Sequence, residues 1–198
     1  LKGHAGYLIS VGFSPDGMSL ASASPGEMIL WDVDKGKQVR RVTIDSGIVA
    51  ISGDWKWMAN SSDEDKDFRI EIRDPRQGTV LGTLRKHEEW AHRLAASQDG
   101  RRLASADRNC VRIWDPESKK CTREIGLATR EYPQDLAFSA DGRILAWSST
   151  SGVGMWSLDE DKEIPCGRMG TGNLLAFSPD GKVLATGESG KILLWAPK

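Results

Sequence analysis

Short apolar runs alternate with polar turn residues along the whole chain. The runs are four to eight residues long and are bounded by Gly, Pro, Asp and Ser. This is the pattern of β-strands joined by tight turns. Helical spacing of apolar residues is not kept up for three turns in any segment. The pattern therefore predicts an all-β protein.

Two short phrases recur through the sequence. The first is Ser-Pro-Asp-Gly or a variant of it, beginning at Ser14, Ser52, Ser97, Ser139 and Ser178. The second is an apolar run that ends at Trp31, Arg73, Trp114, Trp156 and Trp195, positions spaced 42, 41, 42 and 39 residues apart. A period near 40 residues indicates structural repeats. We therefore predict one domain of five units, at about residues 1–43, 44–84, 85–125, 126–169 and 170–198.

Each unit except the last contains four apolar runs. Pro-Asp-Gly between the first and second runs suits a hairpin, because Pro presets φ and Gly accepts a left-handed conformation. A small twisted sheet cannot bury both of its faces alone, so neighbouring sheets are expected to stack around a channel. We predict a β-propeller of four-stranded antiparallel blades. Because the last unit has only three runs, we expect a larger ring, with more blades before Leu1.

The order of the motifs adds a family resemblance. Gly3-His4 is followed by "FSPDG", "LASAS" and "LWD", and the same order returns at His87 with "SQDG", "LASAD" and "IWD". In this order and at this period, the whole chain resembles the WD-repeat β-propeller family. The resemblance implies a non-enzymatic scaffold for protein–protein interaction.

The resemblance also implies a buried network in each blade, made of Trp, a second-strand Ser or Thr, His and a turn Asp. Unit one supplies His4, Ser22 and Trp31, but its turn has no Asp. Unit three supplies the full set of His87, Ser105, Trp114 and Asp107. The other units lack the His, so we expect at most one complete network and mainly apolar packing elsewhere.

Composition and charge limit which partners and which cellular compartment we expect. The chain has 27 basic and 28 acidic residues, a net charge of −1. Such a balance provides no field that would steer the protein to nucleic acid or to an acidic membrane, so we expect neither partner. Cys110, Cys121 and Cys166 are too few for a disulfide scaffold. We expect free thiols and a cytoplasmic location, although an upstream leader stays compatible with the sequence.

Motifs that suggest catalysis or ligand binding lack essential residues. His87 and His92 are five positions apart, whereas a zinc-protease helix needs four. The Gly187–Lys191 segment lacks the first Gly and the final Ser or Thr of a phosphate loop. The first run of each unit is almost entirely apolar, which leaves few groups to do chemistry in the channel. We expect no enzyme, metal or cofactor; the alternatives are a propeller-type enzyme and a sensor or recruitment domain fused to a catalytic domain outside this chain.

The connections between strands are expected to divide between two faces. The turn face holds the short Ser-Pro-Asp-Gly turns and the turns after Trp-Asp. The loop face holds the variable turns after the second strand and the connections between units. Recognition usually lies in variable loops on a rigid frame, and Trp, Tyr and Arg are frequent anchors.

We therefore predict that a protein partner binds the loop face. The candidate residues are Tyr7, Asp63, Glu64, Asp65, Trp90, Arg130 and Tyr132. The alternative is that Trp90 and Tyr132 merely cover strand ends. Unpaired blade edges also make self-association possible.

Overall fold

The computed structural model describes residues 1–45, 48–62, 66–127, 132–165, 174–188 and 190–196. Within these residues, nineteen strands form five separate antiparallel sheets. The all-β prediction is confirmed. No helix in the described part of the chain is long and apolar enough to cross a membrane.

The sheets follow the order of the predicted repeats, and we number them blades 1 to 5. Blade 1 contains β1 (Ser10–Phe13), β2 (Ser19–Ser24), β3 (Glu27–Asp32) and β4 (Lys37–Thr43). Blade 2 contains β5 (Val49–Ile51), β6 (Met58–Ser61), β7 (Ile70–Arg73) and β8 (Val80–Leu84). Blade 3 contains β9 (Arg93–Ala96), β10 (Leu103–Ala106), β11 (Cys110–Asp115) and β12 (Lys120–Gly126).

Blade 4 contains β13 (Asp135–Phe138), β14 (Ile144–Ser149), β15 (Gly152–Ser157) and β16 (Lys162–Glu163). Blade 5 contains β17 (Leu175–Phe177), β18 (Leu184–Glu188) and β19 (Lys191–Trp195). In every blade, each strand pairs with the next one along the chain. Among the described residues, blade 5 therefore has the three strands that the sequence predicts.

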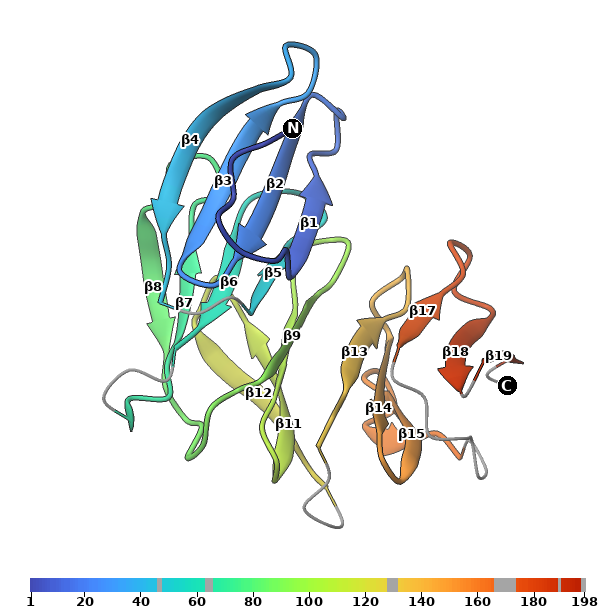
Figure 1. The fold of residues 1–198 in the computed structure, drawn as a ribbon. Coiled ribbons are helices and arrows are strands. Elements are labelled where there is room, and N and C mark those ends of the chain that lie inside the picture. The colour runs from blue at the N-terminus through green and yellow to red at the C-terminus, as the bar shows by residue number, and fades with distance from the viewer. Residues whose placement is uncertain (46–47, 63–65, 128–131, 166–173, 189, 197–198) are drawn as a thin grey trace.

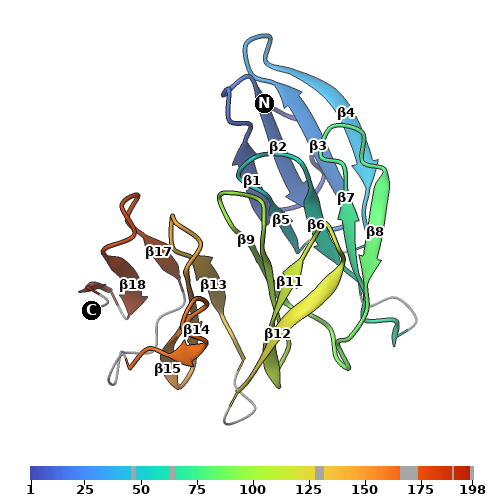
Figure 2. The same cartoon turned by 180° about the vertical axis from the view of Figure 1, so that it is seen from behind.

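The blades follow one another along an arc (Figures 1 and 2). The innermost strands β1, β5, β9, β13 and β17 contact one another in succession. Blades 1 and 5 stand apart at the two ends in both views. The fold is thus a row of stacked propeller blades.

The Ser-Pro-Asp-Gly phrase forms the hairpin between the first two strands of a blade. In blade 1, the amide of Gly17 donates to the carbonyl of Ser14 at 2.8 Å, and Gly17 has a φ of +71°. The Ser14 hydroxyl accepts from the amide of Ser19 at 2.9 Å, which closes the turn. In the divergent copy, Trp55 takes the glycine place with a φ of +58° and is 2% exposed. Burial of this indole holds a conformation that few non-glycine residues adopt.

Neighbouring blades bury their faces against each other. Between blades 1 and 2, Ala21, Met28 and Leu30 pack with Val49 and Met58 in one buried cluster. We call the face that a blade turns toward its higher-numbered neighbour its downstream face, and the opposite face its upstream face. The hydrophobic core is thus divided among the junctions between blades.

Candidate functional site

Blade 3 holds a chain of hydrogen bonds that connects the four residues named from its sequence. The indole Nε1 of Trp114 donates to Ser105 Oγ at 2.7 Å. Ser105 Oγ lies 2.6 Å from His87 Nε2, and His87 Nδ1 lies 2.6 Å from Asp107 Oδ2. Because an indole can only donate, the Ser105 hydroxyl is free to donate to His87 Nε2. His87 Nδ1 then faces the Asp107 carboxylate, which can accept its hydrogen.

Asp107 ends this series of hydrogen bonds, and its carboxylate accepts hydrogen bonds from several groups. Its Oδ1 accepts from the backbone amides of Asn109 at 2.8 Å and Cys110 at 2.9 Å. Its Oδ2 also accepts from Arg112 Nη1 at 2.9 Å. Burial acts to raise the pKa of Asp107, but the hydrogen bonds from His87 and from the Asn109 amide hold this pKa well below its usual range. The carboxylate is therefore a fixed negative charge that orients the imidazole.

Blade 1 contains a second network that the sequence analysis missed. His4 Nε2 lies 2.6 Å from Ser22 Oγ, and Trp31 Nε1 donates to the same oxygen at 2.7 Å. The acid is Glu27, whose Oε1 lies 2.9 Å from His4 Nδ1. The expectation of at most one complete network is wrong, because Glu27, three positions past the place equivalent to Asp107, is long enough to reach the same imidazole. An acidic residue of either length in this turn was the available signal.

Blade 2 replaces the network with ionic groups. Arg73, in the Trp position, donates from Nε to Asn60 Oδ1 at 3.0 Å and to Glu71 Oε2 at 3.0 Å. A third hydrogen bond runs from Arg73 Nη1 to the carbonyl of Gly78 at 2.9 Å. Apolar packing still dominates in this blade, as expected, with Trp57, Ile70 and Ile72 in one core cluster and Met58 in another. Arg73 itself was the signal, because a buried guanidinium requires acceptors.

Ser105, His87 and Asp107 are hydrogen-bonded in the same order as the Ser-His-Asp triad of a hydrolase. Its surroundings argue against that chemistry. Ser105 is 0% exposed, and the side chains of His87 and Asp107 are 1% and 2% exposed. A nucleophile needs an open side for its substrate, and the Ser105 oxygen already accepts from Trp114. The row therefore acts as a structural brace between strands.

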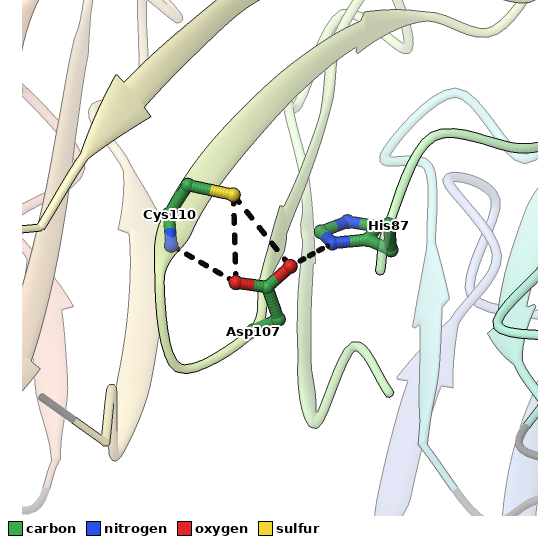
Figure 3. A group of neighbouring side chains, drawn as sticks. All are labelled: His87, Asp107 and Cys110. Carbon is green, nitrogen blue, oxygen red and sulfur yellow. Dashed lines mark hydrogen bonds and ion pairs between the residues drawn. The ribbon is translucent and has the colours of Figure 1, made fainter. Parts of the chain in front are cut away.

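His87, Asp107 and Cys110 also bring three potential metal-ligand atoms within 4.8 Å of one another (Figure 3). The donor set does not fit a cation. Zinc binds thiolate sulfur, whereas burial and the nearby Asp107 charge raise the pKa of the Cys110 thiol to about 12. The Arg112 guanidinium already neutralises the Asp107 carboxylate from 2.9 Å away. The cluster is explained by the blade network.

Strand pairing keeps Cys110 and Cys121 apart. Cys121 is opposite Trp114 in the β11–β12 pair, while Cys110 is opposite Gly126. Both thiols are free. Cys166 lies outside the described residues.

On the loop face, three side chains from different segments form a stacked cluster. Tyr132 is 39% exposed, and the guanidinium of Arg108 lies 4.4 Å from the centre of its ring. Arg108 also donates to the Tyr132 hydroxyl. The ring of His92 packs beneath, with its centroid 4.6 Å from that of Tyr132. Sequence reasoning did not select Arg108, although an arginine in a variable turn after the second strand was a usable signal.

The remaining loop-face candidates differ in their exposure, and four of them lie outside the described residues. Tyr7 precedes β1 and is 76% exposed. Trp90 is half-buried, and its indole Nε1 is enclosed without a hydrogen-bond partner among the described residues. The structure does not describe Asp63, Glu64, Asp65 and Arg130, so these four remain sequence predictions.

The turn face carries a hollow between blades 2 and 3. Its lining includes the apolar Leu81 and the charged Asp54, Lys56, Arg101 and Asp115. Lys56 Nζ pairs with Asp54 at 3.0 Å. Because acids and bases share the lining, the hollow has no single charge that would select a ligand.

Stacked four-stranded blades, two of which are braced by a Trp–Ser–His–acid network, define a β-propeller repeat protein. Residues 1–32, 78–115 and 173–196 match the family described as WD domain, G-beta repeat. The chain is also similar to Periodic tryptophan protein 2 of Arabidopsis thaliana, with 28% identity over 181 residues. That alignment covers 85% of this chain and 20% of the relative, so the chain spans about a fifth of the relative's length. Both matches are to WD-repeat proteins, which are generally interaction scaffolds without catalytic activity.

Proposed function

We propose that this protein is a non-enzymatic scaffold that binds a protein partner through its loop face. The observation that carries the proposal is the stack of Arg108 on Tyr132 on His92. The similarity to WD-repeat proteins supports the general role, and this stack supports the location.

The cluster has the physical properties of an interface anchor. Tyr and Arg are enriched among the residues that dominate binding energy. Arg108 and His92 both contact the Tyr132 ring, so little side-chain entropy remains to be lost when a partner binds. The Tyr132 ring is still 39% exposed and is available for contact.

The buried triad-like row argues against the enzyme alternative. Ser105 is 0% exposed, and its oxygen is occupied by the Trp114 indole. In a scaffold, the same hydrogen bonds stiffen the blade that presents Arg108. A structural role therefore explains the hydrogen bonds among Ser105, His87 and Asp107 without requiring a substrate.

The proposal is tested by affinity capture from the source organism with quantitative mass spectrometry. The double variant Arg108→Ala with Tyr132→Ala is expected to lose a partner that the wild-type chain captures reproducibly. The matched control is Arg101→Ala with Lys182→Ala on the turn face, whose side chains are 84% and 81% exposed. Both variants are expected to melt within a few degrees of wild type. Loss of capture in the turn-face control alone would contradict the proposal.

A further inference from the structure

In the part of the chain that the structure describes, the guanidinium of Arg108 forms no ion pair with a carboxylate. Its contacts are with Tyr132: it lies over the ring, 4.4 Å from the ring centre, and it donates a hydrogen bond to the hydroxyl. Arg112, four residues further along the chain, differs because it pairs with both Asp107 and Glu124. Arg108 is therefore an ordered positive charge without a counter-ion among the described residues.

The backbone that carries Arg108 is held in place by hydrogen bonds. Arg108 lies in the turn between β10 and β11, where the Asp107 carboxylate accepts from the amides of Asn109 at 2.8 Å and Cys110 at 2.9 Å. The amide of Asp107 donates to the carbonyl of Cys110 at 3.1 Å. A fixed turn and a stacked side chain reduce the entropy that binding costs. Arg108 is thus positioned before a partner arrives.

The Tyr132 hydroxyl supplies a second donor beside this charge. A phenol oxygen can accept a hydrogen bond and still donate its own hydrogen. The Tyr132 oxygen accepts from Arg108, and among the described residues its hydrogen has no acceptor. Both side chains are exposed to solvent. An N–H of a guanidinium and the O–H of a phenol are therefore available together to one incoming acceptor.

The charges around this pair of donors favour an anion. Arg93 is a second cation nearby, whose Nη1 donates to the carbonyl of His92 at 2.6 Å. Burial lowers the pKa of His92, and the charge of Arg93 lowers it further. The exposed Glu88 and Glu89 lie in the connection before β9, and neither forms an ion pair with Arg108. An anionic group would therefore reach Arg108 without displacing an acid of this chain.

A carboxylate matches the two donors in shape and in charge. Its two oxygens can accept from two neighbouring donors at once, as they do in bidentate arginine–carboxylate pairs. Its single negative charge equals the single positive charge of Arg108. A phosphoryl group carries a charge of about −1.5 to −2 and three strong acceptor oxygens, which is more than this pair of donors satisfies.

We propose that the partner bound at the loop face presents an Asp or Glu carboxylate to the Arg108 guanidinium and the Tyr132 hydroxyl. The proposal rests on the proposed function and adds the chemical group that the stack recognises. One carboxylate oxygen accepts from Arg108 and the other accepts from Tyr132. An acidic segment of the partner thereby supplies the counter-ion of Arg108.

NMR titration with defined peptides tests this proposal, because it detects weak binding. The isotope-labelled chain is titrated with a blocked peptide of alternating Gly and Glu. The same peptide is also used with Gln in place of Glu, and with phosphoserine in place of Glu. The Glu peptide is expected to shift the amide signals of Arg108, Asn109 and Tyr132 until they saturate. The Gln peptide is expected to leave these signals unchanged, and the phosphoserine peptide to bind no more tightly than the Glu peptide.

Single variants assign the binding to the two donors. Arg108→Ala is expected to bind the Glu peptide at least about tenfold more weakly, because a hydrogen bond to a charged group is lost. Tyr132→Phe keeps the ring beneath the guanidinium and removes only the hydroxyl, so a loss of about two- to tenfold is expected. Arg101→Ala is the matched control, because the Arg101 side chain is 84% exposed on the turn face, and it is expected to bind as wild type. Thermal melts check folding, and Arg108→Gln replaces Arg108→Ala if the latter fails to fold.

No response to the Glu peptide, an equal response to the Gln peptide, or equal affinity in Arg108→Ala and wild type would each overturn the proposal. Much tighter binding of the phosphoserine peptide would also overturn it and would assign the site to a phosphorylated partner.

The capture experiment separates these outcomes from the proposed function. Loss of a captured partner in the double variant, without any response to the Glu peptide, would leave the loop face as the binding surface and exclude only the carboxylate. Capture that the double variant leaves intact would contradict the proposed function itself.

Discussion

At the scale of single residues, Ser105 decides how blade 3 is braced. Its oxygen accepts from Trp114, and its hydrogen is donated to His87. A buried indole N–H without an acceptor costs stability, so the serine satisfies Trp114 and also orients the imidazole. Burial of the Trp114 ring, which is 2% exposed, is the larger contribution, because it removes a large apolar area from water.

Replacing Trp114 and replacing His87 should therefore have unequal effects. Trp114→Ala is expected to lower the free energy of unfolding by about 3–5 kcal/mol, and Trp31→Ala should behave similarly. His87→Ala is expected to cost about 1–3 kcal/mol, because it leaves Ser105 and Asp107 without a partner. Chemical denaturation of the variants measures both. A larger loss in His87→Ala than in Trp114→Ala would show that the hydrogen bonds outweigh ring burial.

At the scale of the blade, different residues occupy the second-strand position that lies beneath the third-strand Trp or Arg. Blades 1 and 3 use a serine beneath Trp, and blade 2 uses Asn60 beneath Arg73. In blade 4, Trp147 occupies the position of the second-strand Ser, and its ring lies over Gly154 on the neighbouring strand β15. The backbone pairing is the same in these blades, while the second-strand residue at this position differs. Any side chain of suitable volume whose polar atoms are satisfied can occupy the position.

Gly154 tests how tightly blade 4 is packed. A Cβ at this position would lie 2.2 Å from Trp147 Cε2. Gly154→Ala is therefore expected to destabilise the protein by about 1–3 kcal/mol, the usual cost of overpacking. Gly126→Ala is the matched control, because nothing lies within 4 Å of its Cβ position. Equal melting temperatures of the two variants would contradict the packing shown here.

At the scale of the whole molecule, stability should vary along the arc. In a stack of repeats, each unit is stabilised mainly by contacts with its neighbours. Within the described residues, blades 2, 3 and 4 have a neighbouring blade on both faces, whereas blades 1 and 5 have one. Blade 5 also lacks a fourth strand among the described residues. Opening should therefore begin at the ends.

Hydrogen–deuterium exchange with mass spectrometry measures this gradient. The slowest amide exchange is expected in β10 and β11 of blade 3, and the fastest strand exchange in β18 and β19 of blade 5. Uniform exchange across the five blades would instead indicate a single cooperative unit.

Much of the architecture could be predicted because it depends on local chemistry. Apolar runs bounded by turn residues predict strands, and Pro-Asp-Gly predicts the hairpins. The even spacing from Trp31 to Trp195 predicts five units, and the run count predicts three strands in the last one.

The sequence by itself thus determined the strands, the repeat and the family. Only the tertiary structure decided which side chains meet across strands and blades. Glu27 reaches His4 over 23 positions, and Arg108 reaches Tyr132 over 24. Such contacts depend on side-chain length and on how the segments stack, neither of which a period near 40 residues encodes.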